Sequence, residues 1–151
     1  MKEINILILS AGTRNKIVQF YKEALGGRGK VIATDCSPYA PALYDADAYE
    51  IVPRIDAPGY LECILALVGK YRARGILSLI DPELSLLAAH AEEFRALGAM
   101  PMISGYELVE TCYHKYRMYE LLREYGIPTA RCWRTPEEFL RDEASGRASY
   151  P

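Results

Sequence analysis

The sequence predicts an α/β fold, a doubly wound sheet of five parallel strands, and three observations support this prediction. The run from Ile4 to Leu9 is almost continuously apolar and too short for a helix, which is typical of a strand buried on both faces. A short polar turn, Ser10 to Asn15, then leads into an amphipathic helix. The same alternation of strand and helix occurs five times before Ile103, which favours parallel strands joined by right-handed crossovers.

The elements follow in a regular order along the chain. With the first strand in the centre, we expect the strand order 3-2-1-4-5. The predicted strands span residues 4–9, 30–35, 49–52, 76–80 and 99–103, and the helices between them begin near residues 15, 58 and 81, the last ending at Gly98. The predicted core residues of the sheet are Ile6, Ile8, Val31, Ile32, Leu77, Leu79 and Met102.

Composition restricts the class of protein. The chain has 151 residues, of which 50% are hydrophobic and 25% charged, with a net charge of −2. These values are ordinary for a soluble globular protein, and the length suits either one domain or one domain and part of another. No basic block predicts nucleic-acid binding, and no apolar run predicts a membrane span or signal peptide, so we expect a cytoplasmic protein. The four cysteines lack C-x-x-C spacing, which favours small buried side chains in a reducing compartment.

The first strand ends at a turn that is a candidate ligand site. The turn contains one glycine, Gly12, and therefore matches neither the G-x-G-x-x-G pattern nor a P-loop. Asp35 ends the second strand, where it serves either to hold a ribose hydroxyl or to form a turn. Glu83 follows Asp81-Pro82 in the first turn of a predicted helix. Two interpretations are open: the helix dipole favours an acidic residue at this position, or Glu83 faces the same rim of the sheet as Gly12 and binds a ligand there.

The alternation changes after Ile103. The segment Ser104-Gly105-Tyr106-Glu107 is a capping box that starts a short helix. A second helix begins at Tyr113-His114-Lys115 and ends at Gly126, before a candidate strand over residues 130–134. Thr135-Pro136 begins a last helix. We therefore divide the chain into a first domain, residues 1–104, and the start of a second domain, residues 105–151.

This order of motifs resembles the N-terminal part of carbamoyl-phosphate-synthase-like ATP-grasp ligases, over essentially all 151 residues. The resemblance implies a Rossmann-like pre-ATP-grasp domain over residues 1–104 and a truncated ATP-grasp N-terminal subdomain over residues 105–151. Tyr150-Pro151 resembles the lead into the strand with a second ATP-binding lysine. The other landmarks are Ser10-Ala11-Gly12, Asp35, Ala46-Asp47, Val52-Pro53, Asp81-Pro82-Glu83-Leu84, and the run from Tyr113-His114-Lys115 to Gly126-Ile127-Pro128-Thr129.

The resemblance also implies a function. A longer parent would use ATP to convert a carboxylate into an acyl phosphate, which an amine or another nucleophile attacks. Lys115 would contact the ATP phosphates, whereas His114 stands where the family has an Asp. Gly12, Thr13, Arg14 and Glu83 would bind the acceptor substrate.

The resemblance assigns no catalytic residue or metal ligand to this chain. ATP and magnesium are expected in the parent, but neither is expected on this fragment, which is expected to be inactive alone. The expected partners are a small-molecule substrate and the remainder of the ATP-grasp domain, and a homodimer is left open.

Two other classes of protein fit the first domain. A Rossmann-type nucleotide-cofactor-binding module usually has two or three glycines in the first turn, where this sequence has one. A non-catalytic regulatory α/β domain of the receiver type requires an acidic cluster after the first strand, where this chain has Ser10-Ala11-Gly12. The regulatory alternative also leaves the segment after Ser104 without an explanation.

Overall fold

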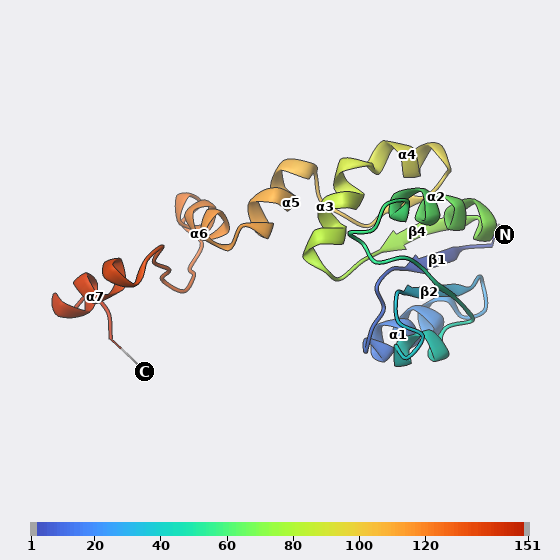
Figure 1. The fold of residues 1–151 in the computed structure, drawn as a ribbon, viewed down its shortest axis with the longest axis horizontal. Helices are drawn as coiled ribbons and strands as arrows, with labels where there is room; N and C mark the ends of the chain where they lie inside the picture. The colour runs from blue at the N-terminus through green and yellow to red at the C-terminus, as the bar shows by residue number, and fades with distance from the viewer. Residues whose placement is uncertain (1–2, 150–151) are drawn as a thin grey trace. The chain divides into compact units, whose positions relative to one another are not determined.

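The structure, a computed structural model, describes residues 3–149 (Figure 1). Tyr150 and Pro151 lie outside the described residues. Their predicted place before a strand with a second ATP-binding lysine therefore stays a prediction. The chain forms two compact units, one that ends at Val109 and one that begins at Glu110. Each unit is described by itself, and the predicted domain boundary after residue 104 stays a prediction. No helix between residues 3 and 149 has the length and apolar character needed to cross a bilayer.

A five-stranded parallel sheet forms the centre of the first unit, in the order β3-β2-β1-β4-β5. This confirms the predicted fold class and strand order. The central strand β1 pairs with β2 on one side and β4 on the other, so that Ile6 lies beside both Val31 and Gly75. The strands are β1 (Asn5–Ile8), β2 (Val31–Asp35), β3 (Ala48–Ile51), β4 (Ala73–Leu77) and β5 (Met100–Pro101).

Helices cover both faces of the sheet, as expected for a doubly wound fold (Figure 1). On one face lie α1 (Asn15–Leu25) and the short 3-10 helix η1 (Pro41–Asp45). On the other face lie α2 (Tyr60–Tyr71), α3 (Asp81–Ala89) and α4 (Ala91–Ala96).

The core has two layers, one on each face of the sheet. Successive residues of a strand point to opposite faces, so β1 contributes Ile6 and Ile8 to one layer and Leu7 to the other. The layer under α1 and η1 includes Val18, Leu25, Val31, Ala33 and Leu43. The layer under α2, α3 and α4 includes Ile32, Ile64, Val68, Ile76, Leu87 and Phe94.

Three of the predicted core residues are less buried than expected. Leu79 is 39% exposed and Met102 is 37% exposed, so the prediction for these two residues is wrong, and Leu77 is only half-buried. The reason for Leu79 is that β4 begins earlier than predicted and ends at Leu77, so Leu79 lies in the following loop. Met102 follows the two-residue strand β5, and its sulfur contacts the Tyr21 hydroxyl at 3.4 Å. The other four, Ile6, Ile8, Val31 and Ile32, are buried as predicted.

The helix predicted from residue 81 to Gly98 is divided in two. α3 ends at Ala89 and α4 begins at Ala91, because His90 has a φ of −109° and a ψ of 20°, outside the helical range. The backbone carbonyl of His90 accepts the amide of Glu93 at 3.0 Å and thereby starts the second helix. The proline after Asp81 occupies the first turn of α3, as its sequence position predicts.

The second unit contains α6 (Lys115–Glu124) and α7 (Pro136–Ala144), and α5 (Tyr106–Tyr113) spans the boundary between the units. Thr135 caps α7 as predicted, because its Oγ1 accepts the amide of Glu138 at 3.3 Å. The strand predicted over residues 130–134 is wrong: this segment has no strand structure. A strand needs a neighbouring strand for its backbone hydrogen bonds, and residues 110–149 contain none.

Candidate functional site

The loop between β1 and α1 follows the carboxyl end of the central strand, where open α/β sheets bind their ligands. Ser10 and Gly12 have left-handed backbone conformations, with φ values of 45° and 54°. Gly12 adopts this conformation easily because it has no Cβ, whereas a serine rarely does. The Gly12 carbonyl accepts the amide of Ala42 at 3.1 Å. The loop therefore has a defined turn conformation, which the glycine permits and a backbone hydrogen bond to Ala42 fixes.

Asp35 at the end of β2 supports this turn. One carboxylate oxygen accepts the backbone amide of Gly12 at 2.9 Å, and the other accepts the amide of Ser37 at 2.9 Å. The amide of Ala11 also donates to the carbonyl of Thr34 at 2.9 Å. Both carboxylate oxygens are thus engaged by backbone amides of the chain itself. This geometry supports the turn-forming interpretation of Asp35 over the ribose-binding one.

Glu83 lies behind the same loop and is fully buried. Its carboxylate accepts hydrogen bonds from three hydroxyl groups: Ser10 at 2.9 Å, Ser78 at 2.5 Å, and Tyr60. Burial and the adjacent Glu83 carboxylate raise the pKa of the Tyr60 hydroxyl above its usual range, so this hydroxyl stays protonated and donates. The network joins the first turn of α3 to the β1–α1 loop, to α2 and to the segment after β4.

Thr13 and Arg14 complete the loop. Thr13 is exposed, and Arg14 is half-buried with its Nη1 donating to the Ser10 carbonyl at 3.2 Å. The structure therefore brings Gly12, Thr13 and Arg14 together at the carboxyl ends of the strands, with Glu83 beneath them through Ser10. A contact of these four residues with substrate stays a prediction. For Glu83, the described contacts are those of a residue that positions the loop.

Lys115 belongs to the second unit, where it is the exposed first residue of α6. His114 is the N-cap, but its side chain makes no capping hydrogen bond. The His114 ring stacks on Tyr113 with centroids 5.9 Å apart. A pocket of about 390 Å³ lies beside Lys115, lined by His114, Lys115, Tyr116, Arg117, Trp133 and Arg134. Lys115 is therefore accessible to solvent at the start of α6 and lines this pocket.

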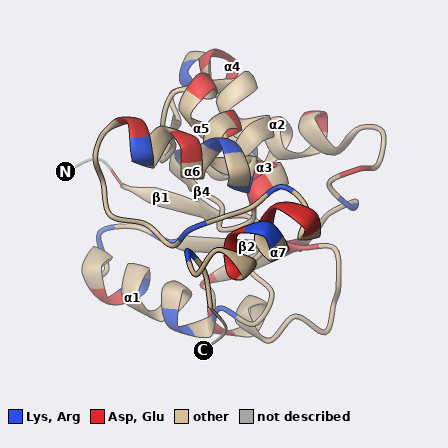
Figure 2. Cartoon of the chain, turned by 90° about the vertical axis from the view of Figure 1, so that its left-hand side faces the viewer, with Lys and Arg blue, Asp and Glu red and all other residues tan. Residues whose placement is uncertain are grey.

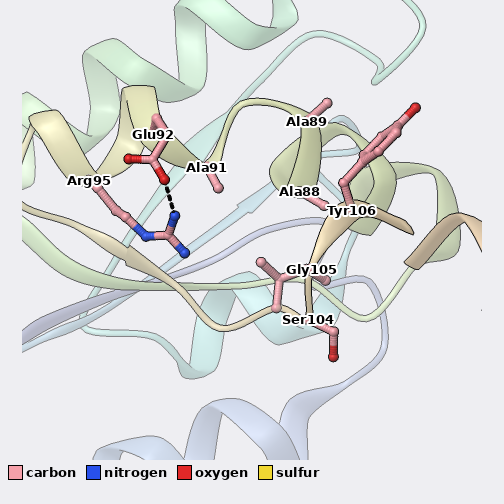
Figure 3. A pocket seen from close by; sticks show the side chains of 9 residues that line it. Ala88, Ala89, Ala91, Glu92, Arg95, Ser104, Gly105 and Tyr106 are labelled. Carbon is pink, nitrogen blue, oxygen red and sulfur yellow. Dashed lines mark hydrogen bonds and ion pairs between the residues drawn. The ribbon is translucent and has the colours of Figure 1, made fainter. Parts of the chain in front are cut away.

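A smaller pocket of about 200 Å³ lies in the first unit, between α3, α4 and the start of α5 (Figure 3). Figure 3 shows its alanine-rich wall and the ion pair between Glu92 and Arg95. Its walls are formed by Ala88, Ala89, Ala91, Glu92, Arg95, Ile103, Ser104, Gly105 and Tyr106. None of the predicted site residues lines this pocket.

The donor groups required by magnesium are not gathered in this part of the chain. Divalent cations of this kind are held by several carboxylate or other oxygen ligands. Within residues 3–149, no three His, Cys, Asp or Glu side chains are grouped so that they could hold a metal ion.

Residues 6–103 match the family model of the PylC-like N-terminal domain. The chain belongs to this family. The matched segment includes the five strands of the PylC-like domain, apart from Asn5 at the start of β1, and all four of the predicted substrate residues. It ends before Lys115. No curated protein matches the chain by sequence. The family supports the pre-ATP-grasp resemblance inferred from the motif order.

Several solved structures share the fold of this PylC-like chain. An N5-carboxyaminoimidazole ribonucleotide synthetase in complex with ADP aligns with 100% of the chain, at 16% identity and a TM-score of 0.67. The N5-carboxyaminoimidazole synthetase of Staphylococcus aureus with ADP aligns with 97%, at 19% identity and a TM-score of 0.66. The biotin carboxylase domain of a single-chain bacterial carboxylase aligns with 95%, at 19% identity and a TM-score of 0.58. The chain spans 37%, 37% and 34% of these proteins, respectively.

Two groups of residues escaped the sequence analysis. The hydroxyls around Glu83 come from Ser10, Tyr60 and Ser78, which are far apart in sequence and belong to no motif. Tyr60 gave one weak signal, because it begins an apolar helix with a polar hydroxyl. The second group is an arginine-rich pocket of the second unit. The four arginines of this pocket are dispersed over residues 123–147, so no local spacing identifies them.

Proposed function

We propose that this chain is the N-terminal part of an ATP-dependent carboxylate–amine or related ligase of the ATP-grasp class. In the proposed reaction the parent protein transfers the γ-phosphoryl group of ATP to a substrate carboxylate. An amine or another nucleophile then attacks the acyl phosphate and releases inorganic phosphate. The protein acts on a small-molecule substrate in the cytoplasm, and its ATP site includes residues beyond those of this chain.

The alignment with the ADP complex of the carboxyaminoimidazole ribonucleotide synthetase supports this proposal most directly. The alignment extends over the whole chain, so it includes the second unit as well as the PylC-like domain. At 16% identity this likeness concerns the fold. The chain also spans only 37% of that protein, which fits a role as one part of a larger ligase.

The proposal gives each predicted site residue a task. The β1–α1 loop forms one wall of the acceptor site, and the Arg14 guanidinium pairs with a substrate carboxylate. Lys115 contacts the nucleotide phosphates as a positive point charge. ATP is the expected cosubstrate of the parent. The proposal places the magnesium ligands in the rest of the ATP-grasp domain, which is the expected structural partner of residues 105–151.

The activity is tested on the protein encoded by the complete gene. We expect ATP hydrolysis to ADP and phosphate that depends on one member of a panel of small carboxylic acids together with an amine. The isolated 151-residue chain serves as a comparison and should not hydrolyse ATP. A parent protein that reduces a nicotinamide cofactor, or that releases no ADP with any member of the panel, contradicts the proposal.

Lys115→Ala in the parent tests the proposed nucleotide contact. A charge-assisted hydrogen bond is worth about 1.5–3 kcal/mol, so the substitution should raise the KM for ATP by at least tenfold. The KM for the carboxylate should change less. Lys30→Ala is the control, because Lys30 is also an exposed lysine but does not line the pocket beside Lys115. Steady-state kinetics with an unchanged KM for ATP and an unchanged kcat would remove Lys115 from the proposed site.

A further inference from the structure

An arginine-rich pocket of about 340 Å³ lies in the second unit, between α6, α7 and the segment that joins them. Its volume is within the range of pockets that hold small molecules. Four arginines line it, together with two tyrosines, a tryptophan, a cysteine and two acidic residues. The lining residues are Tyr116, Tyr119, Arg123, Arg131, Cys132, Trp133, Glu138, Arg141, Asp142 and Arg147.

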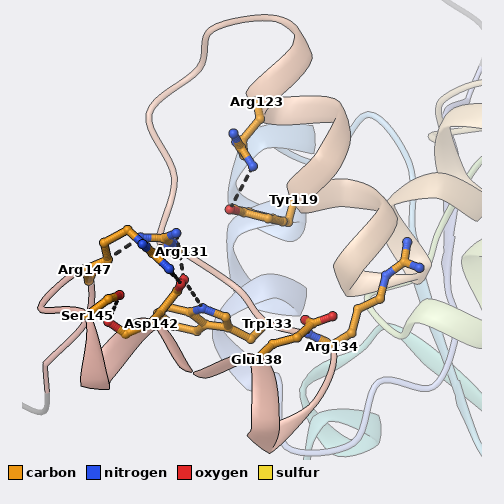
Figure 4. A network of polar contacts seen from close by, with 9 residues as sticks. All are labelled: Tyr119, Arg123, Arg131, Trp133, Arg134, Glu138, Asp142, Ser145 and Arg147. Carbon is orange, nitrogen blue, oxygen red and sulfur yellow. Dashed lines mark hydrogen bonds and ion pairs between the residues drawn. The ribbon is translucent and has the colours of Figure 1, made fainter. Parts of the chain in front are cut away.

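Asp142 organises one wall of this pocket (Figure 4). Its carboxylate pairs with Arg131 Nη2 at 2.7 Å and with Arg147 Nη2 at 2.8 Å. It also accepts the Trp133 indole Nε1–H at 2.8 Å. Figure 4 shows the two guanidinium groups converging on this single carboxylate. Asp142 is mostly buried, whereas its two arginines are about half-exposed and keep further N–H groups for another acceptor.

The remaining charges of the pocket are mainly positive. Arg123 donates only a long hydrogen bond, 3.4 Å, to the buried Tyr119 hydroxyl. Within residues 3–149, the Arg141 guanidinium group has no hydrogen bond or ion pair. The Glu138 carboxylate accepts the backbone amide of Arg134 at 2.9 Å. The pocket thus holds four guanidinium groups and two carboxylates, an excess of two positive charges.

We propose that this pocket binds the phosphate group of a small organic phosphate monoester. A phosphate monoester carries between about −1.5 and −2 charges at pH 7 and has three acceptor oxygens, which matches the excess charge of the pocket. The planar guanidinium group of arginine binds phosphate through two parallel N–H···O bonds. The pocket is also larger than a phosphate ion, which leaves room for the rest of the ligand beside Tyr116 and Trp133. The guanidinium groups of Arg134 and Arg131 lie over these two rings, at 4.3 Å and 5.4 Å from their centroids.

The site is tested on the full 151-residue chain with ribose 5-phosphate as the probe, by calorimetry at low ionic strength. We expect saturable binding of ribose 5-phosphate, weaker binding of inorganic phosphate, and loss of affinity at high salt. Arg123→Gln and Arg141→Gln should each raise the Kd about tenfold, because each removes a charged donor. Both variants leave the Asp142 contacts of Arg131 and Arg147 intact. The fluorescence of Trp133, the single tryptophan, shows whether the unit remains folded.

Arg117→Gln is the matched control, since Arg117 is an exposed arginine of α6 that does not line this pocket. Unchanged affinity in Arg117→Gln supports the site, whereas an equal loss there reveals general attraction between charges and overturns it. Absence of saturable binding, or equal affinity for citrate, also overturns the assignment to an organic phosphate. The result is independent of the ligase proposal, because Lys115 does not line this pocket.

Discussion

Glu83 is the residue whose surroundings say most about the β1–α1 loop. It is fully buried and accepts hydrogen bonds from the hydroxyls of Ser10, Tyr60 and Ser78. Ser10 has a left-handed backbone conformation, which serine rarely adopts. The hydrogen bond from its hydroxyl to Glu83 therefore helps to stabilise this turn. In the proposed acceptor site, the placement of Gly12 to Arg14 therefore depends on a carboxylate beneath the loop.

Glu83→Gln should destabilise the first unit by about 1–3 kcal/mol, because it replaces one accepting carboxylate oxygen with an NH₂ group that cannot accept the hydroxyl hydrogen it faces. Urea unfolding followed by circular dichroism measures the loss as a lower midpoint. Glu92→Gln is the control, since the Glu92 side chain is 86% exposed and its replacement should change the free energy of unfolding by less than about 0.5 kcal/mol. Equal midpoints for the two variants would show that the hydroxyl network contributes little.

At the level of elements, side-chain contacts with α7 position the segment before this helix, where the sequence predicted a strand with backbone hydrogen bonds. Asp142 on α7 joins Arg131, Trp133 and Arg147, and the Trp133 ring lies edge-on against Phe139 with centroids 5.1 Å apart. Figure 2 shows both signs of charge on α7. This explains how residues 130–134 are placed although no strand forms there.

The contacts of Asp142 predict a pH-dependent change in this element. Hydrogen bonds from Trp133 and Arg147 lower the pKa of Asp142 below its usual value of 3.8. A carboxyl group with a lowered folded pKa stabilises the fold fully above its unfolded pKa, and this stabilisation is lost as the pH falls through the folded pKa. We therefore expect Trp133 fluorescence to change below pH 3.8.

Asp142→Asn should abolish this fluorescence transition. Glu137→Gln should retain it, although the pKa of Glu137 is also lowered, by hydrogen bonds to its own backbone and to Thr135. Glu137 makes no hydrogen bond to the indole within the described residues, so it is the control for general acid unfolding. An identical transition in Asp142→Asn would show that another group controls the tryptophan.

At the scale of the whole molecule, the two units differ in how much apolar surface they bury. The first unit has a core on each face of its sheet. Among the described residues from Glu110 onward, Tyr119 is the buried hydrophobic residue. Tyr125, Ile127 and Leu140 are more than half exposed. Such apolar side chains usually meet a partner surface, which is consistent with a role for the second unit inside a larger domain.

This difference predicts faster hydrogen exchange after residue 105 than in the five strands of the sheet, because backbone hydrogen bonds with little buried apolar support open locally. Mass spectrometry of the dilute 151-residue chain measures the exchange peptide by peptide. Peptides of β1 and β2 are the internal reference. Equal or greater protection in α6 and α7 contradicts the prediction, and increased protection of α6 and α7 in the parent would support the proposed larger domain.

The sequence by itself determined the fold class and the strand order. Runs such as Ile4 to Leu9 are local signals, because a strand buried on both faces needs consecutive apolar residues. The cap at Thr135 was predictable for the same reason, since its partner Glu138 is three residues away. The motif order also led to the pre-ATP-grasp resemblance that the PylC-like match supports, whereas the narrower likeness to carbamoyl phosphate synthase stays a prediction.

The tertiary structure decided which polar residues meet. Glu83 looks in sequence like an acidic residue favoured in a first helical turn, but Ser10 from the β1–α1 loop and Tyr60 from α2 converge on it. The strand expected over residues 130–134 failed because a strand depends on a neighbour that local sequence does not contain. Burial and pairing are properties of segments distant in sequence, so these features follow from the folded chain and not from spacing.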